Sequence, residues 1–189
     1  MCPSRFHLAR LCWTVAAIIL VLAASYSSAQ ERRPTENQVE AAYLYNFGKF
    51  VTWPAERAMP TSQFEICVLG KDPFGEVLDA TVTGENINGK KIAVRRLSSM
   101  QQVESCRILF VSSSEEERLS TILEAAQRLS LLTVSTMKHF ARRGGDIGLV
   151  SQNDRIRFEV NRAAVAKSHL LLSSELLKVA VKVIGEPGS

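Results

Sequence analysis

Hydrophobic residues at helical spacing indicate the first element of the chain. The apolar positions that recur every three or four residues are Val39, Tyr43, Phe47 and Phe50. Such spacing places one apolar stripe along a helix. Thr35, with Gln38 three residues later, has the spacing of a capping box, and Pro54 disfavours helical backbone at Trp53. We therefore expect a helix that begins at Thr35 and ends before Trp53.

Between residues 64 and 135, short apolar runs alternate with helical segments. The predicted strands span residues 64–69, 91–96, 107–111 and 131–135. Helices are predicted to begin at Asp72 and after Ser112, where aspartate and serine are good N-caps. This alternation is typical of right-handed βαβ crossovers and of a mainly parallel sheet that helices cover on both faces.

The last part of the chain predicts a hairpin and a helix. Residues 147–150 and 155–160 flank a polar turn, so we expect an antiparallel edge of the sheet there. Residues 162–183 predict a final helix, and its apolar stripe would contain Leu172, Leu176, Val179 and Val183. The predicted fold is a single three-layer α/β/α sandwich with a mainly parallel sheet and a C-terminal antiparallel hairpin.

Residues 1–29 have the pattern of an export signal. A basic start is followed by the almost wholly apolar residues 11–24 and by small residues at Ser27 and Ala29. We expect cleavage after Ala29 and a periplasmic domain over residues 30–189, with an uncleaved anchor as the alternative. Removing the signal takes away two basic residues and no acid, which lowers the net charge from +4 to +2. So small a charge without a basic cluster is not typical of a nucleic-acid-binding protein.

The sequence carries no recognisable catalytic motif. It has no dinucleotide or P-loop glycine pattern, no Gly-x-Ser-x-Gly elbow and no Cys-x-x-Cys pair. His139 and His169 neighbour no evident nucleophile and are interpreted as surface or helix-packing residues, and Gly144-Gly145-Asp146-Ile147 is interpreted as a turn. We expect no enzyme activity, no cofactor and no metal site. The alternative is an exported hydrolase with an irregular site.

Two of the four cysteines, Cys67 and Cys106, lie outside the expected signal. One falls in the first predicted strand and the other just before the third, and these strands are neighbours in a sheet of order 2-1-3. Cysteines of exported proteins usually pair, so we predict a disulfide between them. A loop of this length stabilises the fold by roughly 4 kcal/mol in the chain-entropy model. The bridge fits two roles, a permanent staple or a switch that responds to redox conditions in the envelope.

Several segments of the chain resemble the YfiR family of exported bacterial proteins. They are residues 41–54 (AAYLYNFGKFVTWP), 143–148 (RGGDIG), 157–162 (RFEVNR) and 172–177 (LSSELL). The resemblance implies a periplasmic repressor that binds the periplasmic part of an inner-membrane diguanylate cyclase. An outer-membrane, peptidoglycan-binding lipoprotein would sequester the repressor, which links envelope stress to cyclic-di-GMP and biofilm formation. The resemblance also implies a fold-supporting disulfide, which Cys67 and Cys106 match, whereas the second cysteine pair of some relatives has no counterpart.

The predicted hairpin suits a docking surface. Alternation would place Ile156, Phe158 and Val160 toward the core, and Arg155, Arg157 and Glu159 outward. By the resemblance, Glu159 is the first residue to test for contact with the cyclase, and Arg157 and Ile147 are further candidates. The alternative for these charges is a solvated row without a partner.

Two other arrangements fit the predicted fold. A periplasmic small-molecule binding protein that feeds a membrane sensor is the alternative function, because open α/β sheets bind ligands at the carboxyl ends of their strands. A ligand could also bias repression, so the two functions are compatible. A homodimer through exposed helices is a further expected form of association.

Overall fold

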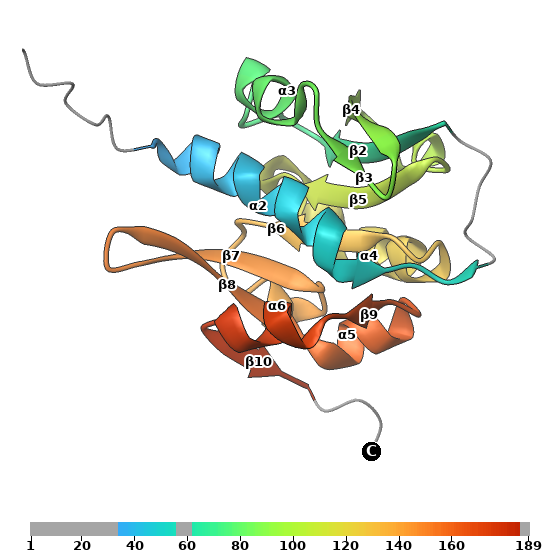
Figure 1. Cartoon of the computed structure of the whole chain (residues 1–189). Coiled ribbons are helices and arrows are strands. Elements are labelled where there is room, and N and C mark those ends of the chain that lie inside the picture. The colour runs from blue at the N-terminus through green and yellow to red at the C-terminus, as the bar shows by residue number, and fades with distance from the viewer. Residues whose placement is uncertain (1–33, 56–61, 186–189) are drawn as a thin grey trace, which may run out of the picture. The chain divides into compact units, whose positions relative to one another are not determined.

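Helix α2 (Glu36–Phe50) is the first element among the described residues of the computed structural model, which are 34–55 and 62–185 (Figure 1). The predicted capping box is present at its start. Thr35 Oγ1 accepts a hydrogen bond from the Gln38 backbone N–H at 3.3 Å, and the Gln38 side chain accepts one from the Thr35 N–H at 2.8 Å. These two bonds satisfy backbone donors that the first turn of a helix leaves unpaired.

The buried face of α2 is shifted from the predicted stripe. Its buried residues are Glu40, Ala41, Leu44, Phe47 and Gly48. Phe47 is fully buried as predicted, whereas Phe50 is 39% exposed. Gly48 explains the shift, because a Cβ at this position would collide with Ile87 and Phe64 of the sheet. The helix therefore approaches the sheet along a line that includes its smallest residues.

An eight-stranded sheet lies at the centre of the described residues, in the order β10-β8-β7-β6-β5-β2-β4-β3. Its strands are β2 (Gln63–Leu69), β3 (Asn86–Ile87), β4 (Lys90–Leu97), β5 (Cys106–Val111), β6 (Leu132–Ser135), β7 (Ile147–Gln152), β8 (Arg155–Asn161) and β10 (Lys182–Ile184). Strands β4, β2, β5, β6 and β7 pair in parallel, and the β7–β8 and β3–β4 pairs are antiparallel. The predicted strands are confirmed, and so is the 2-1-3 order, because β2 lies between β4 and β5.

Helices cover both faces of this sheet, which confirms the predicted α/β class and its three layers (Figure 1). The helices that share a hydrophobic cluster on the first face are α2, α3 (Glu76–Val82), α5 (Arg162–Lys167) and α6 (Ser174–Val179). Helix α4 (Leu119–Arg128) forms a second cluster on the opposite face. Side chains of β5 alternate between the two clusters, with Phe110 in the first and Leu109 in the second.

The prediction of one C-terminal helix over residues 162–183 is wrong. The segment forms α5, the short strand β9 (Leu171–Leu172), α6 and the edge strand β10. Helix α5 cannot continue because His169 has left-handed backbone with φ of 55°. Ser173 then starts α6, since its Oγ accepts a hydrogen bond from the Leu176 N–H at 3.2 Å. Strand β9 pairs with β1 (Val51–Thr52) in a separate antiparallel sheet.

The outer strand of the sheet also differs from the prediction. The hairpin of β7 and β8 is antiparallel as predicted, but β10 pairs in parallel with β8 and forms the edge instead. Of the residues predicted to form one helical stripe, Leu176 is buried, whereas Val179 and Val183 are 62% and 42% exposed. These valines lie at the end of α6 and in the edge strand, outside the core.

Two helix starts are displaced from their predicted positions. Helix α3 begins at Glu76, because Asp72 Oδ1 accepts a hydrogen bond from the Phe74 N–H at 2.7 Å and forms a turn before it. After β5, a 3₁₀ segment, η3 (Ser113–Arg118), precedes α4. Ser112 is a cap as predicted, but it caps η3 rather than an α-helix.

The predicted export signal, residues 1–29, lies outside the described residues, and so does its cleavage site after Ala29. Within residues 34–55 and 62–185, none of the helices combines the length and the apolar character needed to cross a membrane.

Candidate functional site

Three charged side chains of β8 lie on the face of the hairpin that points away from α2. We call Arg155, Arg157 and Glu159 the charged row. The residues between and after them are Ile156, Phe158 and Val160, with exposed fractions of 9%, 2% and 0%. Arg155 is exposed, and Arg157 and Glu159 are half-buried. The predicted alternation of core and outward residues along this strand is therefore confirmed.

The surroundings leave the charged row accessible. The hydrophobic cluster beneath α4 contains no residue from the described strands β7 and β8. Glu159 stands opposite Gly148 in the antiparallel register, and the edge strand places Lys182 on its other side. The ion pairs of the described residues include no member of the charged row. These charges are available to a partner of complementary charge.

Ile147, the third residue expected to contact a partner, lies in the core. Its exposed fraction is 0%, and it is in register with Val134 of β6 and Val160 of β8. A partner could touch this side chain only if the sheet opened. In this conformation Ile147 positions the hairpin, whereas Arg157 and Glu159 face outward.

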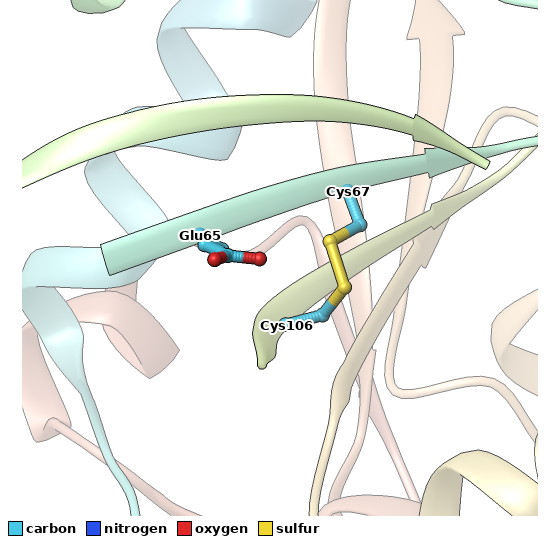
Figure 2. A group of neighbouring side chains, drawn as sticks. All are labelled: Glu65, Cys67 and Cys106. Carbon is cyan, nitrogen blue, oxygen red and sulfur yellow. A yellow bond between two sulfur atoms is a disulfide. The ribbon is translucent and has the colours of Figure 1, made fainter. Parts of the chain in front are cut away.

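The predicted disulfide joins Cys67 of β2 to Cys106 at the start of β5 (Figure 2). The two Cα atoms are 5.9 Å apart, and both side chains have an exposed fraction of 0%. The bridge fastens two parallel neighbours at the centre of the sheet. By the chain-entropy model, a loop of 39 residues gives roughly 4 kcal/mol of stabilisation.

Glu65 lies beside the bridge, and its carboxylate and the two sulfur atoms are within 4.8 Å of one another (Figure 2). Two thiolates and a carboxylate can bind a metal ion, but the sulfurs here are bonded to each other. The Glu65 carboxylate is also engaged, since it accepts hydrogen bonds from Arg95 at 2.9 Å and from Ser105 at 2.5 Å. The oxidised group is therefore a structural junction.

Asp146 is a buried acid at the start of the hairpin, with an exposed fraction of 1%. Its Oδ2 accepts hydrogen bonds from the Thr133 N–H at 2.8 Å and from the Thr133 hydroxyl at 2.6 Å, and Ser168 Oγ lies 3.5 Å from Oδ1. Burial raises the pKa of this carboxyl to about 6, although the hydrogen bonds oppose that rise. The acid links β6, the hairpin and the end of α5.

The glycine before Asp146 fixes this arrangement. A Cβ on Gly145 would collide with the ring of Phe140, so only glycine lets the chain pass there. The segment 144–147 is interpreted from the sequence as a turn, and this is correct for residues 144–146, whereas Ile147 is the first residue of β7. Its resemblance to a family motif was the signal that more than a turn is present, but a buried acid cannot be distinguished from an exposed one by its sequence neighbours.

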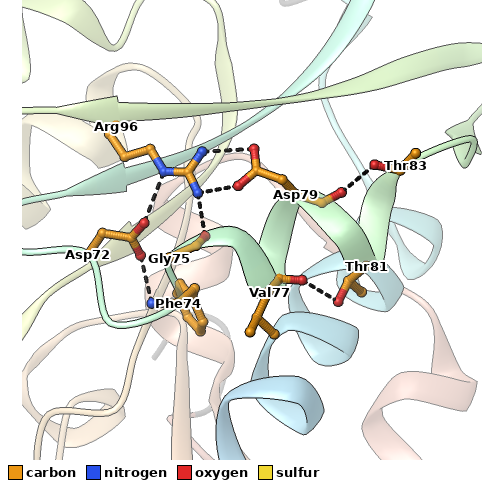
Figure 3. Close-up of polar contacts among 8 residues, drawn as sticks. All are labelled: Asp72, Phe74, Gly75, Val77, Asp79, Thr81, Thr83 and Arg96. Atoms are coloured by element: carbon orange, nitrogen blue, oxygen red, sulfur yellow. Dashed lines mark hydrogen bonds and ion pairs between the residues drawn. The ribbon is translucent and has the colours of Figure 1, made fainter.

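Arg96 of β4 clamps the start of α3 to the sheet (Figure 3). Its Nε donates to Asp72 at 2.9 Å, its Nη1 donates to Asp79 at 2.9 Å, and its Nη2 donates to the Gly75 carbonyl at 2.7 Å and also to Asp79. The Arg96 hydrogen bonds hold the pKa of Asp79 below its usual value. This guanidinium is saturated by groups of the protein itself.

The carboxyl ends of β2, β4 and β5 form the crevice where the fold class would place a ligand. Residues that line it include Gly70, Lys71, Arg96, Ser98, Gln102 and Ser114. Arg96 is occupied by the α3 clamp, and Ser114 Oγ accepts a hydrogen bond from the Lys71 N–H at 2.9 Å. Glu115 pairs with Arg118. Several polar groups of this crevice are thus engaged within the protein.

The amino-acid sequence matches the model of one protein family, described as YfiR/HmsC-like, over residues 37–181. This chain belongs to the YfiR/HmsC-like family. The matched range contains the charged row, the disulfide and Asp146. Members of the family are periplasmic regulatory proteins, and a buried disulfide is consistent with export.

One solved structure shows that the fold recurs in another protein. A conserved domain protein from Vibrio cholerae O1 biovar eltor has a TM-score of 0.56 at 10% identity, over 79% of this chain and 60% of that one. The YfiR/HmsC-like chain thus spans about 60% of that protein, and the likeness shows the fold alone. An ABC domain from Streptococcus pneumoniae in complex with L-Trp has a TM-score of 0.46 at 11% identity, over 68% of this chain and 57% of that one. This similarity is too low to show a shared fold. No match was found among curated proteins.

The histidines of the YfiR/HmsC-like domain agree with their interpretation as surface residues. His139 and His169 are both exposed, and both have left-handed backbone with φ of 59° and 55°. They stand at turns, where they end the local segment rather than assist a nucleophile.

Proposed function

We propose that this YfiR/HmsC-like chain represses an inner-membrane diguanylate cyclase by binding the cyclase's periplasmic part through the charged row. The observation that carries the proposal is the accessible, unpaired set of charges on β8, the strand inside the edge of the sheet. Sequestration of the repressor by an outer-membrane, peptidoglycan-binding lipoprotein would release the cyclase. Repression by contact requires a complementary surface and no catalytic group.

The charged row has the balance of charges that gives specificity. Glu159 lies between Arg157, two residues along the strand, and Lys182 of the edge strand. A partner must therefore present a cation to Glu159 and acids to its neighbours, and a wrong pattern would place like charges together.

Reversal of the charge at Glu159 tests this proposal. We expect Glu159→Arg to release cyclase activity in cells, because an arginine repels the cation that Glu159 would attract. The readout is the intracellular cyclic-di-GMP level, together with the amount of repressor that co-purifies with the cyclase. Loss of the ion pair between Glu159 and the partner should raise the dissociation constant of the complex by roughly 10-fold or more.

The matched control is Glu117→Arg, which makes the same charge reversal at an exposed residue of η3. Both variants must accumulate in the periplasm at the level of the unmodified chain, as measured by immunoblotting. If Glu159→Arg represses as well as the unmodified chain, the charged row is not the docking surface. If both variants lose repression equally, net charge rather than this surface controls the interaction.

A further inference from the structure

A cavity of about 260 Å³ lies on the α2 side of the sheet, where β2 and β5 begin. Its apolar lining includes Val51, Trp53, Phe64 and Ile87, and its polar lining includes Lys90 and Arg107. The cavity is at the opposite strand ends from the crevice described above, since Phe64 and Arg107 are each the second residue of their strands. It is also on the opposite face of the sheet from the charged row.

Arg107 brings an unneutralised cation to this cavity. The residue is half-buried, its Nη1 is buried, and that atom has no hydrogen-bond acceptor. The ion pairs found among the described residues include none with Arg107. Burial alone lowers the pKa of its guanidinium. A buried charge that lacks a partner is costly, so a negative group placed nearby would be bound favourably.

Trp53 lines the same cavity and also carries an unpaired donor. Its Nε1 is buried and has no acceptor. The indole is held edge-to-face against Phe64, with ring centroids 5.4 Å apart. Buried polar groups are nearly always hydrogen-bonded, so two orphaned donors at one cavity are unusual. None of the described lining residues is an acid, and Lys90 adds a second cation.

We infer that this cavity binds a small organic anion, in which a carboxylate or a phosphate is attached to a flat apolar body. Arg107 and Lys90 would neutralise the anion, and the wall around Trp53 would cover the body. A volume of 260 Å³ equals roughly nine waters at ~30 Å³ each, which limits the ligand to about one ring and its acidic group. The aromatic and aliphatic wall favours such a ring over an inorganic ion.

Tryptophan fluorescence provides a direct test. The chain has two tryptophans, and Trp13 lies within the predicted export signal, so in protein that has lost the signal the fluorescence comes from Trp53 alone. The exported protein is titrated with benzoate, phenyl phosphate, benzamide and inorganic phosphate. We expect saturable binding of benzoate, phenyl phosphate or both, and the stronger of the two identifies the acidic group. Benzamide, the neutral analogue, and inorganic phosphate, which lacks a ring, should each bind at least ~10-fold more weakly.

Substitutions then assign the charge to Arg107. Arg107→Gln should raise the dissociation constant at least ~10-fold, and Arg107→Lys should restore part of the affinity. Arg142→Gln, at an exposed arginine of the turn η4 (Ala141–Arg143), is the matched control and should bind normally. Thermal unfolding verifies that each variant is folded. If Arg107→Gln protein does not fold, the binding measurement is made on Arg107→Lys protein instead.

Three outcomes would overturn the inference. One is the absence of saturable binding by both organic anions. Another is equal binding of benzamide and benzoate, which would show an apolar crevice without charge recognition. The third is undiminished binding by folded Arg107→Gln protein. If that variant does not fold, undiminished binding by Arg107→Lys protein, with the same dissociation constant as folded Lys90→Gln protein, has the same meaning.

Discussion

At the scale of single residues, environment rather than residue type decides what the acids of this protein do. Asp146 and Glu40 are both acids with exposed fractions below a tenth, 1% and 8%. Burial raises the pKa of Asp146 to about 6, and burial together with Glu36 raises the pKa of Glu40 to about 7. Both carboxyls therefore titrate near neutral pH, far above their range in an unfolded chain.

The raised pKa of Asp146 predicts that mild acid stabilises the fold. Its pKa is about 6 in the folded state and about 3.8 when unfolded, so the folded state binds the proton first. Stability should rise as the pH falls from 7 to 5 through the folded pKa, by about 1 kcal/mol from this group. Urea unfolding at several pH values measures the slope. Asp146→Asn mimics the protonated acid and should remove this part of the slope.

Glu40→Gln separates the second acid from the first. Glu40 has its own raised pKa, so the single variants should each flatten part of the pH dependence and the double variant should flatten most of it. The measurement stays above pH 5, because acids with lowered pKa values, such as Asp79, lose their favourable interactions at lower pH. A slope that is unchanged in Asp146→Asn would show that this carboxyl does not titrate in the expected range.

At the scale of elements, local patterns predicted most of the strands but not the C-terminal segment. Strands such as β5 are continuous apolar runs, which mark a strand buried on both faces. The C-terminal segment has helical spacing, yet β10 exists because of its pairing with β8, a contact between distant residues. A three-residue strand and the left-handed turn at His169 leave little trace in hydrophobic periodicity.

The candidate site was predictable to the same degree. Period-two alternation placed Arg157 and Glu159 on the outer face, because side chains of a strand alternate between faces. Ile147, a candidate partner contact in the sequence, is buried, and one strand residue cannot be assigned to a face before the register of its neighbours is known. The cavity near Arg107 is lined by residues of five strands, β1 to β5, and had no local signal.

The Arg96 clamp makes a prediction at the same scale. Arg96→Gln should free the start of α3, because it removes bonds to Asp72, Asp79 and the Gly75 carbonyl. The side chain is 36% exposed, so solvent screens the ion pairs and we expect a loss of only about 1 kcal/mol in urea unfolding. Hydrogen exchange of α3 amides should accelerate more than that of the sheet.

Arg95→Gln is the control for this clamp. Arg95 is the adjacent residue of β4, has a similar exposure of 38%, and pairs with Glu65 of β2 instead of α3. Its substitution should leave α3 exchange unchanged. Equal acceleration in both variants would mean that the whole β4 edge loosens and that the clamp is not specific to α3.

At the scale of the whole molecule, one covalent bond joins the two strands at whose start the proposed cavity lies. The disulfide connects β2 and β5 beneath α4, the charged row lies farther along the same face, and the cavity opens on the other face where these two strands begin. Loss of the bridge would relax the centre of the sheet. The exposure of the disulfide to solvent, rather than its position in the sheet, decides whether the bond acts as a permanent staple or as a redox switch.

Burial of the bridge predicts a staple. Both cysteines are 0% exposed, so a thiol reductant can reach the sulfurs only when the fold opens. Incubation with dithiothreitol in native buffer should leave the bridge intact for far longer than in urea, as measured by alkylation of free thiols and mass spectrometry. The double substitution Cys67→Ala/Cys106→Ala should lower the free energy of unfolding by roughly 4 kcal/mol, within a range of about 2–5. Rapid reduction of the folded protein, with release of the cyclase in cells, would instead identify a redox switch.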